Sequence, residues 1–369
     1  MRSQLIRRSS LGLTAAVGAA AVAAGALGLA SAGAQTVAHT ASATTPSAKV
    51  VAPAKKLGGV TLNVGDQAGT GAEAVLEAAG LINSNNVLKD GLQVKWADFT
   101  AGPPILQAIA SGSLDIGGVG DAPPVFANPA AKEVIVGVLK SSYDNAALLV
   151  PANSPITSVS QLAGKTIAVG VGTSADYHLL TVLEDNGLKP SQVTIDSLTG
   201  AAGLEALEAG DVAAFDTWSP YVEDAEANGA RVLVTGPPYG SPYSYQVASE
   251  TALQNSAKVL AIRDYLTELD KAYVWVKSHP ANWAKSWAAV TGLPLDVMSQ
   301  ATLDDPYTPT AVTSNAVVQE QDLVSAFSSA GVIPASYNFA PYVTSAFSDS
   351  VTGKWSKPTT KTKPKPKKK

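Results

Sequence analysis

Short apolar runs alternate with amphipathic stretches along most of this chain of 369 residues. The runs are rich in Val, Ile and Leu, as expected of buried strands, and the stretches between them repeat apolar residues at helical spacing. Such an alternation is typical of an α/β fold with parallel-rich sheets flanked by helices. In the first half of the chain it predicts strands over 60–65, 92–99, 114–120, 133–140 and 146–151, and helices over 71–82, 103–112 and from Asp121 onward.

The same alternation starts again near Val150. The last strand of this second unit could lead the chain back to the first. From Ser256 to Ala289 the pattern is helical, and Trp283 and Trp287 are expected in the core because residues four apart share one face of a helix. Residues 158–188 predict a short helix, a strand and a longer helix. The remaining predicted strands are 193–198, 212–218, 230–236 and 243–249, and the remaining helices are 201–210 and 221–229.

The two units repeat one local pattern. In each, a glycine-rich turn lies between a strand and a helix. In each, a similar segment also leads into a strand: Gly112-Ser113-Leu114-Asp115 in the first unit and Gly210-Asp211-Val212-Ala213 in the second. This likeness predicts two similar lobes that face each other across a cleft. Ligands of parallel α/β sheets bind at the carboxyl ends of the strands, so the cleft is the expected site.

Both ends of the chain differ in composition from the part between them. Arg2, Arg7 and Arg8 precede an uncharged run, which predicts an export signal over 1–34. The signal could be secretory or twin-arginine, and cleaved or kept as an anchor. Residues 35–56 lack apolar periodicity and predict a flexible linker. The tail 354–369, rich in Lys and Pro, predicts disorder and either a solubilising role or attachment to an anionic wall polymer or membrane surface.

The net charge and the composition of the segment between these ends exclude several classes of function. From Leu57 to Gly353 the chain carries 30 acidic and 12 basic side chains, a net charge of −18. Nucleic-acid binding is therefore not expected, because phosphate contacts need clustered Lys and Arg. The absence of cysteine excludes disulfides, thiolate metal sites, cysteine nucleophiles and a lipid-anchored lipoprotein. The three histidines are too scattered to predict a metal site, and no cofactor is expected.

The stretch AVGVGTSADYHLL at 168–180 raises one enzymatic possibility. Its glycines follow an apolar run, precede a helical pattern and lie about twenty residues before Asp196, as in a dinucleotide fingerprint. The alternative is an anion cradle, because any helix N-terminus offers free backbone N–H groups. The fingerprint is not repeated in the first lobe, and dinucleotides are scarce outside the cell. An exported dinucleotide-dependent oxidoreductase that uses the loop 170–175 is therefore the alternative function.

Three stretches resemble the substrate-binding proteins of ABC importers, within the group that binds aliphatic sulfonates, nitrate and taurine. They are FTAGPPILQAIASGSLDIGGVGDAPPVFA at 99–127, LAGKTIAVGVGTSADYHLLTVLEDNGL at 162–188, and Trp218-Ser219-Pro220-Tyr221. The resemblance extends from about Val60 to Pro334. It implies a two-lobe periplasmic-binding-protein fold of the type II kind, which closes on its ligand by a hinge motion.

The resemblance also implies lobe boundaries, partners and location. One lobe would comprise 57–147 and 246–353, and the other 148–245. The protein would be exported to the periplasm or cell surface and act as a monomer. It would deliver a small anion, first of all an aliphatic sulfonate, to an ABC permease. Related desulfinases and pyrimidine synthases use cysteine or histidine-rich motifs that this chain lacks, so a hydrolytic or carbon–sulfur-cleaving enzyme is not expected.

Two departures from the sulfonate-type pattern leave other ligands open. Ser219 stands where Asp is common, and Leu303-Asp304-Asp305-Pro306-Tyr307 replaces a segment in which a basic residue often precedes the tyrosine. Sulfate esters, taurine and nitrate therefore remain candidate ligands beside aliphatic sulfonates.

Three predicted helix starts offer an anion site without arginine, since a helix N-terminus presents unpaired N–H groups and about half a positive charge. They lie at 67–71, 100–103 and 172–174. Some candidates have structural alternatives, because Thr173 and Asp121 could cap their helices and Trp218 and Tyr245 could pack in the core. The predicted ligand-binding residues are Gln67, Thr70, Gly102, Gly120, Asp121, Thr173, Ser174, Trp218 and Tyr245.

Overall fold

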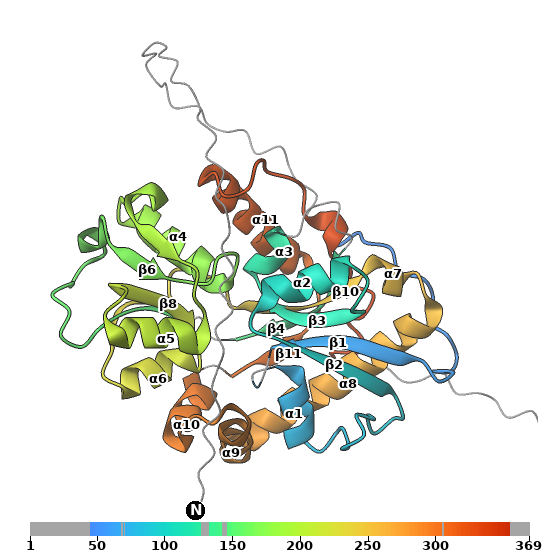
Figure 1. Cartoon of the computed structure of the whole chain (residues 1–369). Coiled ribbons are helices and arrows are strands. Elements are labelled where there is room, and N and C mark those ends of the chain that lie inside the picture. Colours follow the sequence, from blue (N-terminus) through green and yellow to red (C-terminus); the bar gives the residue numbers. More distant parts are fainter. Residues whose placement is uncertain are drawn as a thin grey trace, which may run out of the picture. The chain divides into compact units, whose positions relative to one another are not determined.

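The computed structural model describes residues 45–67, 69, 71–126, 133–141, 146–304 and 306–354. The predicted export signal, the predicted linker up to residue 44 and the lysine-rich tail from residue 355 lie outside the described residues. From Thr45 on, the described chain forms two β-sheets with helices on both faces of each sheet (Figure 1).

The first sheet has the strand order β11-β4-β10-β3-β1-β2. β1 runs parallel to β2 and β3, and β10 runs antiparallel between β3 and β4. β4 is buried along nearly its whole length, which explains its unbroken apolar run, because helices cover both of its faces. The strands are β1 (Thr61–Gln67), β2 (Gln93–Phe99), β3 (Ile116–Gly120), β4 (Glu133–Lys140), β10 (Tyr243–Ser249) and β11 (Thr308–Thr310).

The second sheet has the order β7-β6-β8-β5-β9. β6 runs parallel to β7 and β8, whereas β5 runs antiparallel to β8 and β9. Both sheets are therefore mixed but rich in strands of one direction: β1, β2, β3 and β4 run one way in the first sheet, and β6, β7, β8 and β9 run one way in the second. The strands β10 and β11 of the first sheet and β5 of the second oppose their neighbours. The strands are β5 (Ala146–Val150), β6 (Thr166–Ala168), β7 (Thr194–Asp196), β8 (Ala214–Trp218) and β9 (Arg231–Thr235).

The chain passes from the first sheet to the second between β4 and β5, and it returns between β9 and β10. The predicted lobe boundaries at 147/148 and 245/246 fall inside β5 and β10, which start at Ala146 and Tyr243. By sheet membership the change of lobe comes a few residues earlier at both places. The other predicted boundaries stay predictions.

Helices enclose each sheet and bury a separate apolar cluster on each face. In Figure 1, α2, α3 and α11 lie on one side of the first sheet, and α1 and α8 on the other. Within the described ranges, no helix combines enough length and apolarity to cross a bilayer. The helices are α1 (Ala72–Ala78), α2 (Gly102–Ala110), α3 (Ala122–Phe126), α4 (Ser174–Asp185), α5 (Gly200–Ala209), α6 (Tyr221–Ala227), α7 (Glu250–Leu253), α8 (Ser256–Ser278), α9 (Pro280–Thr291), α10 (Leu295–Asp304) and α11 (Ser314–Ser329).

The helical pattern from Ser256 to Ala289 forms two helices and not one. α8 ends at Ser278 and α9 begins at Pro280, with His279 between them outside helical geometry at φ −134° and ψ 49°. Proline has no N–H and disfavours helical backbone at the residue before it, so the helix breaks at His279. The break turns α9 back over α1 and α8, with which it packs.

The second half of the predicted linker is held against the first lobe. The N–H groups of Ser47, Ala48, Val51 and Ala54 donate to carbonyls of the folded part at 2.8–3.1 Å. Val50 and Val51 also pack against the apolar core of that lobe. The expectation of a flexible linker is therefore wrong over this segment, because the contacts depend on distant residues that composition does not reveal.

Candidate ligand-binding site

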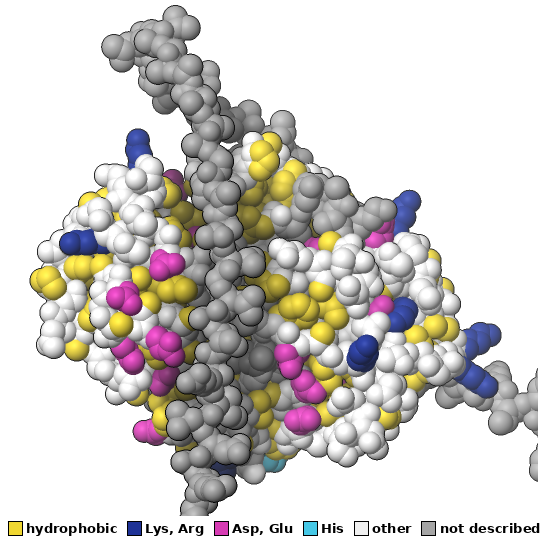
Figure 2. Space-filling view, viewed as in Figure 1, with side chains coloured by type: hydrophobic (Ala, Val, Ile, Leu, Met, Phe, Trp, Pro, Cys, Tyr) yellow, Lys and Arg dark blue, Asp and Glu magenta, His cyan; other side chains and the backbone are white. Residues whose placement is uncertain are grey.

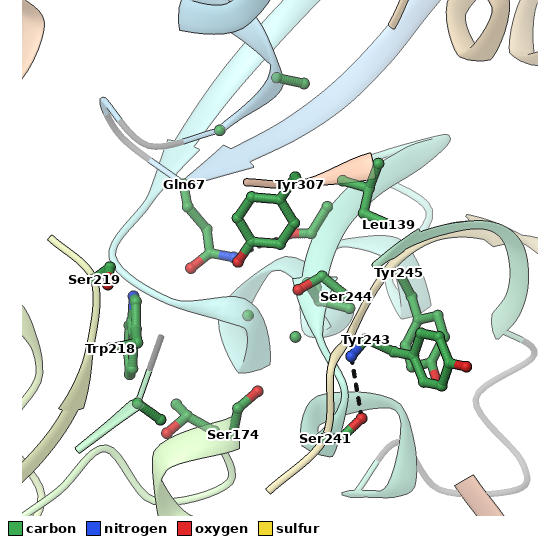
Figure 3. Close-up of a pocket in the computed structure, with 18 of the residues that line it drawn as sticks. Gln67, Leu139, Ser174, Trp218, Ser219, Ser241, Tyr243, Ser244, Tyr245 and Tyr307 are labelled. Carbon is green, nitrogen blue, oxygen red and sulfur yellow. Dashed lines mark hydrogen bonds between the residues drawn. The ribbon is translucent and has the colours of Figure 1, made fainter. Parts of the chain in front are cut away.

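A cavity of about 160 Å³ lies between the two sheets, with walls from both lobes (Figure 3). Its lining includes the carboxyl ends of β1, β3 and β8, which is where ligands of α/β sheets bind. Asp121 lies behind the wall, and Thr70 is outside the described residues. The other predicted ligand-binding residues, which all line the cavity, are Gln67, Gly102, Gly120, Thr173, Ser174, Trp218 and Tyr245.

The glycine-rich turn of the second lobe brings the start of α4 to this cavity. Thr173 precedes the helix with extended backbone, and its hydroxyl donates to the carbonyl of Gly170 at 2.6 Å. The side chain of Thr173 therefore does not cap α4. Asp176 accepts instead from the N–H of Gly172 at 2.9 Å. The N–H groups of the first turn, which begins at Ser174, have no helical acceptor and lie at the cavity wall.

Glycine permits close packing at two places in the wall. A Cβ at Gly102, the first residue of α2, would lie 2.7 Å from Pro123 Cγ. A Cβ at Gly120, the last residue of β3, would lie 2.2 Å from the Oγ of Ser174 in the other lobe. Both distances are shorter than van der Waals contact, so Pro123 and Ser174 can approach this closely only because glycine has no side chain. The Ser174 hydroxyl thus lies directly against the first lobe.

Asp121 is fully buried behind this contact. Its Oδ1 accepts from the N–H of Ala122 at 2.9 Å, at the start of α3. Burial raises the pKa of Asp121 to about 6, although the hydroxyls of Ser174 and Ser241 lower it. The carboxyl group therefore supports the cavity wall through the two serines.

Gln67 and Trp218 extend into the cavity from opposite lobes (Figure 3). The Nε2 of Gln67 donates to the carbonyl of Gly118 at 3.2 Å, which orients the amide. Trp218 ends β8 and is half-buried. Next to Trp218, the Ser219 hydroxyl donates to Glu223 at 2.6 Å. Ser219, which stands where Asp is common in the sulfonate-type pattern, therefore forms its hydrogen bond within its own lobe.

Four aromatic residues from the helices and loops of the first lobe line the cavity. They are Tyr273 of α8, Trp283 and Trp287 of α9, and Tyr307. The two tryptophan rings are stacked with centroids 5.2 Å apart, and both residues are buried, which confirms the prediction that they lie in the core. Their place at the cavity was not predicted, because helical spacing shows which residues share a face but not what that face meets.

The end of the loop before β10 and the first residues of β10 supply cavity residues that sequence reasoning missed. Tyr239 and Ser241 lie in the loop, Tyr243 and Ser244 begin the strand, and all four line the cavity. The available signal was the polar run GSPYSY, in which we expected only a connection followed by the start of a strand. Tyr245 has a fully buried ring that stacks on Tyr243 at 6.4 Å, so it contributes to the wall from within the core.

His178 and Asp216 form a buried pair in the second lobe. Nδ1 of His178 lies 2.8 Å from Oδ2 of Asp216, and Nε2 lies 3.2 Å from the carbonyl of Thr235. Both ring nitrogens thus face acceptors, as in an imidazolium. Burial lowers the pKa of His178, but the charge and hydrogen bond of Asp216 raise it above its ordinary value overall. His178 also reaches the cavity wall.

The lining contributed by the described residues contains no Lys or Arg. In Figure 2, Asp and Glu side chains are spread over both halves of the visible face, in agreement with the net charge of −18 from Leu57 to Gly353. An anion in this cavity would therefore be held by N–H and O–H donors and not by a basic side chain, as the three helix starts predict.

Asp66, at the end of β1, caps helix α1. Its Oδ1 accepts from the N–H of Ala72 at 2.6 Å, and its Oδ2 from the N–H of Glu73 at 3.4 Å. Burial raises the pKa of Asp66 to about 7. The carboxylates of Asp66, Glu73 and Asp98 lie within 4.8 Å of one another, but the backbone of α1 already uses both oxygens of Asp66. We assign this group a capping role.

Two α/β lobes with a ligand-sized cavity between them define a two-lobe substrate-binding protein. Residues 91–292 match the family model described as ABC transporter, phosphonate, periplasmic substrate-binding protein. The chain belongs to this family of periplasmic substrate-binding proteins of ABC transporters.

Individual relatives are named for sulfonates. The chain is 32% identical over 209 residues to the putative aliphatic sulfonates-binding protein of Escherichia coli K12, a match that spans 56% of this chain and 65% of that protein. It is 29% identical to the taurine-binding periplasmic protein of the same strain, over 70% of this chain and 85% of that protein. The alkanesulfonate-binding protein SsuA from Xanthomonas axonopodis pv. citri, solved bound to MOPS, aligns with a TM-score of 0.71 and 27% identity, over 79% and 99% of the two chains.

These findings confirm the resemblance and the predicted two-lobe α/β fold. They also confirm the prediction that the protein serves transport and is not an enzyme. The alternative of an oxidoreductase built on the loop 170–175 is wrong, since the family is one of binding proteins. Asp196, its expected ribose ligand, lies exposed at the end of the edge strand β7. The ligand roles of the individual site residues stay predictions.

Proposed function

We propose that the protein binds an aliphatic sulfonate in the cavity and delivers it to an ABC permease without chemical turnover. The observation that carries this proposal is the composition of the cavity lining, which combines polar donors from α4 and from the loop before β10 with aromatic rings from β8, α8 and α9. An alkanesulfonate can use both, because it has an anionic head with three acceptor oxygens and an apolar tail.

The start of α4 is suited to the anionic head. Its first-turn N–H groups lack helical acceptors, and the helix contributes about half a positive charge at this end. Ser174, Ser241 and Ser244, whose hydroxyls are further possible donors, also line the cavity. Thr173 would act chiefly through its backbone, because its hydroxyl proton is already donated to Gly170.

The size of the cavity favours a ligand with a tail. A volume of 160 Å³ has room for on the order of ten water-sized groups, at roughly 10–15 Å³ each. Nitrate alone would leave most of this space to water. A butyl or hexyl chain would bury its methylenes against Trp218 and the rings of α9, at about 0.8 kcal/mol for each methylene.

Taurine fits the same head but not the same tail. Its ammonium group would need a carboxylate, and Asp66 is the acid in the described lining. Because both Asp66 oxygens accept from the backbone of α1 and its pKa is raised to about 7, it offers a weak counter-charge. We therefore expect taurine to bind more weakly than butanesulfonate.

The proposal extends to the rest of the protein. Residues 1–34 would direct export, and a monomer would present its ligand to the permease. The eight lysines from Lys354 to Lys369 would attach it to an anionic wall polymer or membrane surface.

A thermal-shift screen tests the ligand class. It compares butanesulfonate, hexanesulfonate, taurine, nitrate, methylphosphonate and NAD. A ligand at about 100 times its Kd stabilises the folded state by about 2.7 kcal/mol, and we expect the largest rise in melting temperature with an alkanesulfonate. The largest rise with NAD or nitrate would overturn the proposal.

Variants then test the site. The double variant Thr173→Ala/Ser174→Ala should abolish the largest shift. Ser299→Ala, at a half-buried position of α10 outside the cavity lining, is the matched control and should keep it. Normal binding by the double variant would show that the anion lies elsewhere.

A further inference from the structure

Two carboxyl groups lie behind the wall made by Gly120 and Ser174. Asp121 follows β3 and Glu320 lies on α11, and each is fully buried. Within the described part of the chain, neither forms an ion pair with a basic side chain. A buried carboxylate without a counter-charge is costly, so at least one of these groups holds a proton over part of the neutral range.

The two oxygens of Asp121 differ. Oδ1 accepts from the N–H of Ala122, whereas Oδ2 is buried and makes no hydrogen bond among the described residues. The hydroxyls of Ser174 and Ser241 lie close enough to the carboxyl group to lower its pKa. Both serines also line the cavity (Figure 3), so each contributes both to the surroundings of the carboxyl group and to the ligand space.

The other groups around Asp121 supply no positive charge. Glu320 approaches from α11, Tyr245 from β10 and Tyr177 from α4. Burial raises the pKa of Glu320 well above its ordinary value, and the nearby Asp121 raises it further, which favours the neutral form of Glu320. Burial also keeps the phenols of Tyr245 and Tyr177 protonated. Asp121 is therefore the group of this set that changes charge near neutral pH.

The protonation state of Asp121 decides what the serines offer to an anion. An ionised carboxylate attracts their hydroxyl protons, so neither hydroxyl donates to the cavity, and the carboxylate itself repels an anion there. A proton on Oδ2 reverses this arrangement, because the carboxyl group can donate to one serine oxygen. Both hydroxyls are then free to donate to the ligand.

We propose that Asp121 is a positioning residue of the anion site and that the protein takes up one proton from solvent there when it binds its sulfonate. This inference rests on the proposed function. The proton moves to Oδ2 of Asp121, and no bond of the ligand is made or broken.

Proton uptake predicts the pH dependence of affinity. The pKa of Asp121 without ligand is about 6, and the bound anion raises it. Above about pH 6 the Kd should rise toward tenfold for each pH unit, because a proton must be taken from solvent. From about pH 5.5 to about pH 8 the total is on the order of 50-fold.

Titration calorimetry with butanesulfonate tests this, since its sulfonate stays ionised throughout. Measurements near pH 8 in two buffers of different ionisation enthalpy count the protons taken up. Wild type should take up about one proton. Asp121→Asn keeps the Oδ1 acceptor and presents an amide donor in place of Oδ2, so it should take up none and bind with a Kd independent of pH.

Three further variants separate other sources of the proton. Glu320→Gln should leave the proton count unchanged. So should Asp66→Asn and His178→Gln, which each remove a titratable group that lines the cavity. Uptake that persists in Asp121→Asn, or disappears in Glu320→Gln, Asp66→Asn or His178→Gln, would overturn the assignment to Asp121. Sulfonate binding by wild type without proton uptake would overturn the inference alone, whereas no sulfonate binding at any pH would overturn the proposed function with it.

Discussion

Replacing Gly120 by alanine tests whether the contact between the lobes sets up the anion site. The added Cβ would lie 2.2 Å from the Oγ of Ser174 but 3.5 Å from its Cβ. Gly120 is not among the glycines with positive φ, so alanine fits its backbone. The clash is relieved when the Ser174 hydroxyl rotates away. The variant should therefore fold normally but lose one donor to the ligand.

The size of this loss follows from the charge of the ligand. A hydrogen bond to a charged group contributes roughly 1.5–3 kcal/mol, which corresponds to about one to two orders of magnitude in Kd. Titration calorimetry with butanesulfonate should show this weakening. Without ligand, the free energy of unfolding of Gly120→Ala should change by less than about 1 kcal/mol in a denaturant melt.

Ser174→Ala separates the contact from a general disturbance. By itself it should weaken binding to a similar extent. In its presence Gly120→Ala should cost little more, because the remaining approach of 3.5 Å between the two Cβ positions is ordinary contact. An equal loss from Gly120→Ala with and without the serine hydroxyl would refute the reasoning.

Three further changes probe the tail site and the buried charges. Trp218→Ala should reduce the gain of about 0.8 kcal/mol for each methylene from methanesulfonate to hexanesulfonate, and an unchanged slope in calorimetry would mean that the tail lies elsewhere. The folded-state pKa of Asp66, about 7, exceeds its unfolded value, so wild type loses stability as the pH rises toward 7, by at most roughly 4 kcal/mol. Asp66→Asn keeps an acceptor for α1 and avoids this loss, so the melting temperature of the variant should increase relative to that of wild type as the pH rises. If the difference between the two melting temperatures does not change with pH, the argument that burial raises the pKa of Asp66 is contradicted. Asp216→Asn removes the charged partner of His178 and should lower the free energy of unfolding by about 3–5 kcal/mol in denaturant melts, whereas a loss below about 1 kcal/mol would argue against a buried ion pair.

Features with a local cause were predictable from the sequence. β4 and β10 follow their predicted ranges to the residue, because polar or turn-forming residues bound both segments. The start of α4 at Ser174 follows from the glycine-rich turn before it. Strand direction has no such local cause, since the period of apolar residues is the same in parallel and antiparallel strands. The mixed sheets were therefore not predicted.

Contacts between distant segments account for most of what was missed at the site. Ser174 meets Gly120 only when the two lobes are in place, and His178 meets Asp216 across 38 residues of sequence. Asp121 was expected as a ligand contact or a cap, and its position behind two serines depends on the loop before β10. Helix starts and glycines showed where an anion could bind, but not which hydroxyls would surround it.

A crystal structure of the protein with 3-bromopropanesulfonate tests the central claim most directly, because the anomalous signal of bromine locates the tail independently of the head. The account predicts sulfonate oxygens within hydrogen-bond distance of the first-turn N–H groups of α4 and of the Ser174 hydroxyl, with the bromine against Trp218 and the rings of α9. A sulfonate bound away from the start of α4, or a tail directed toward solvent, would contradict it.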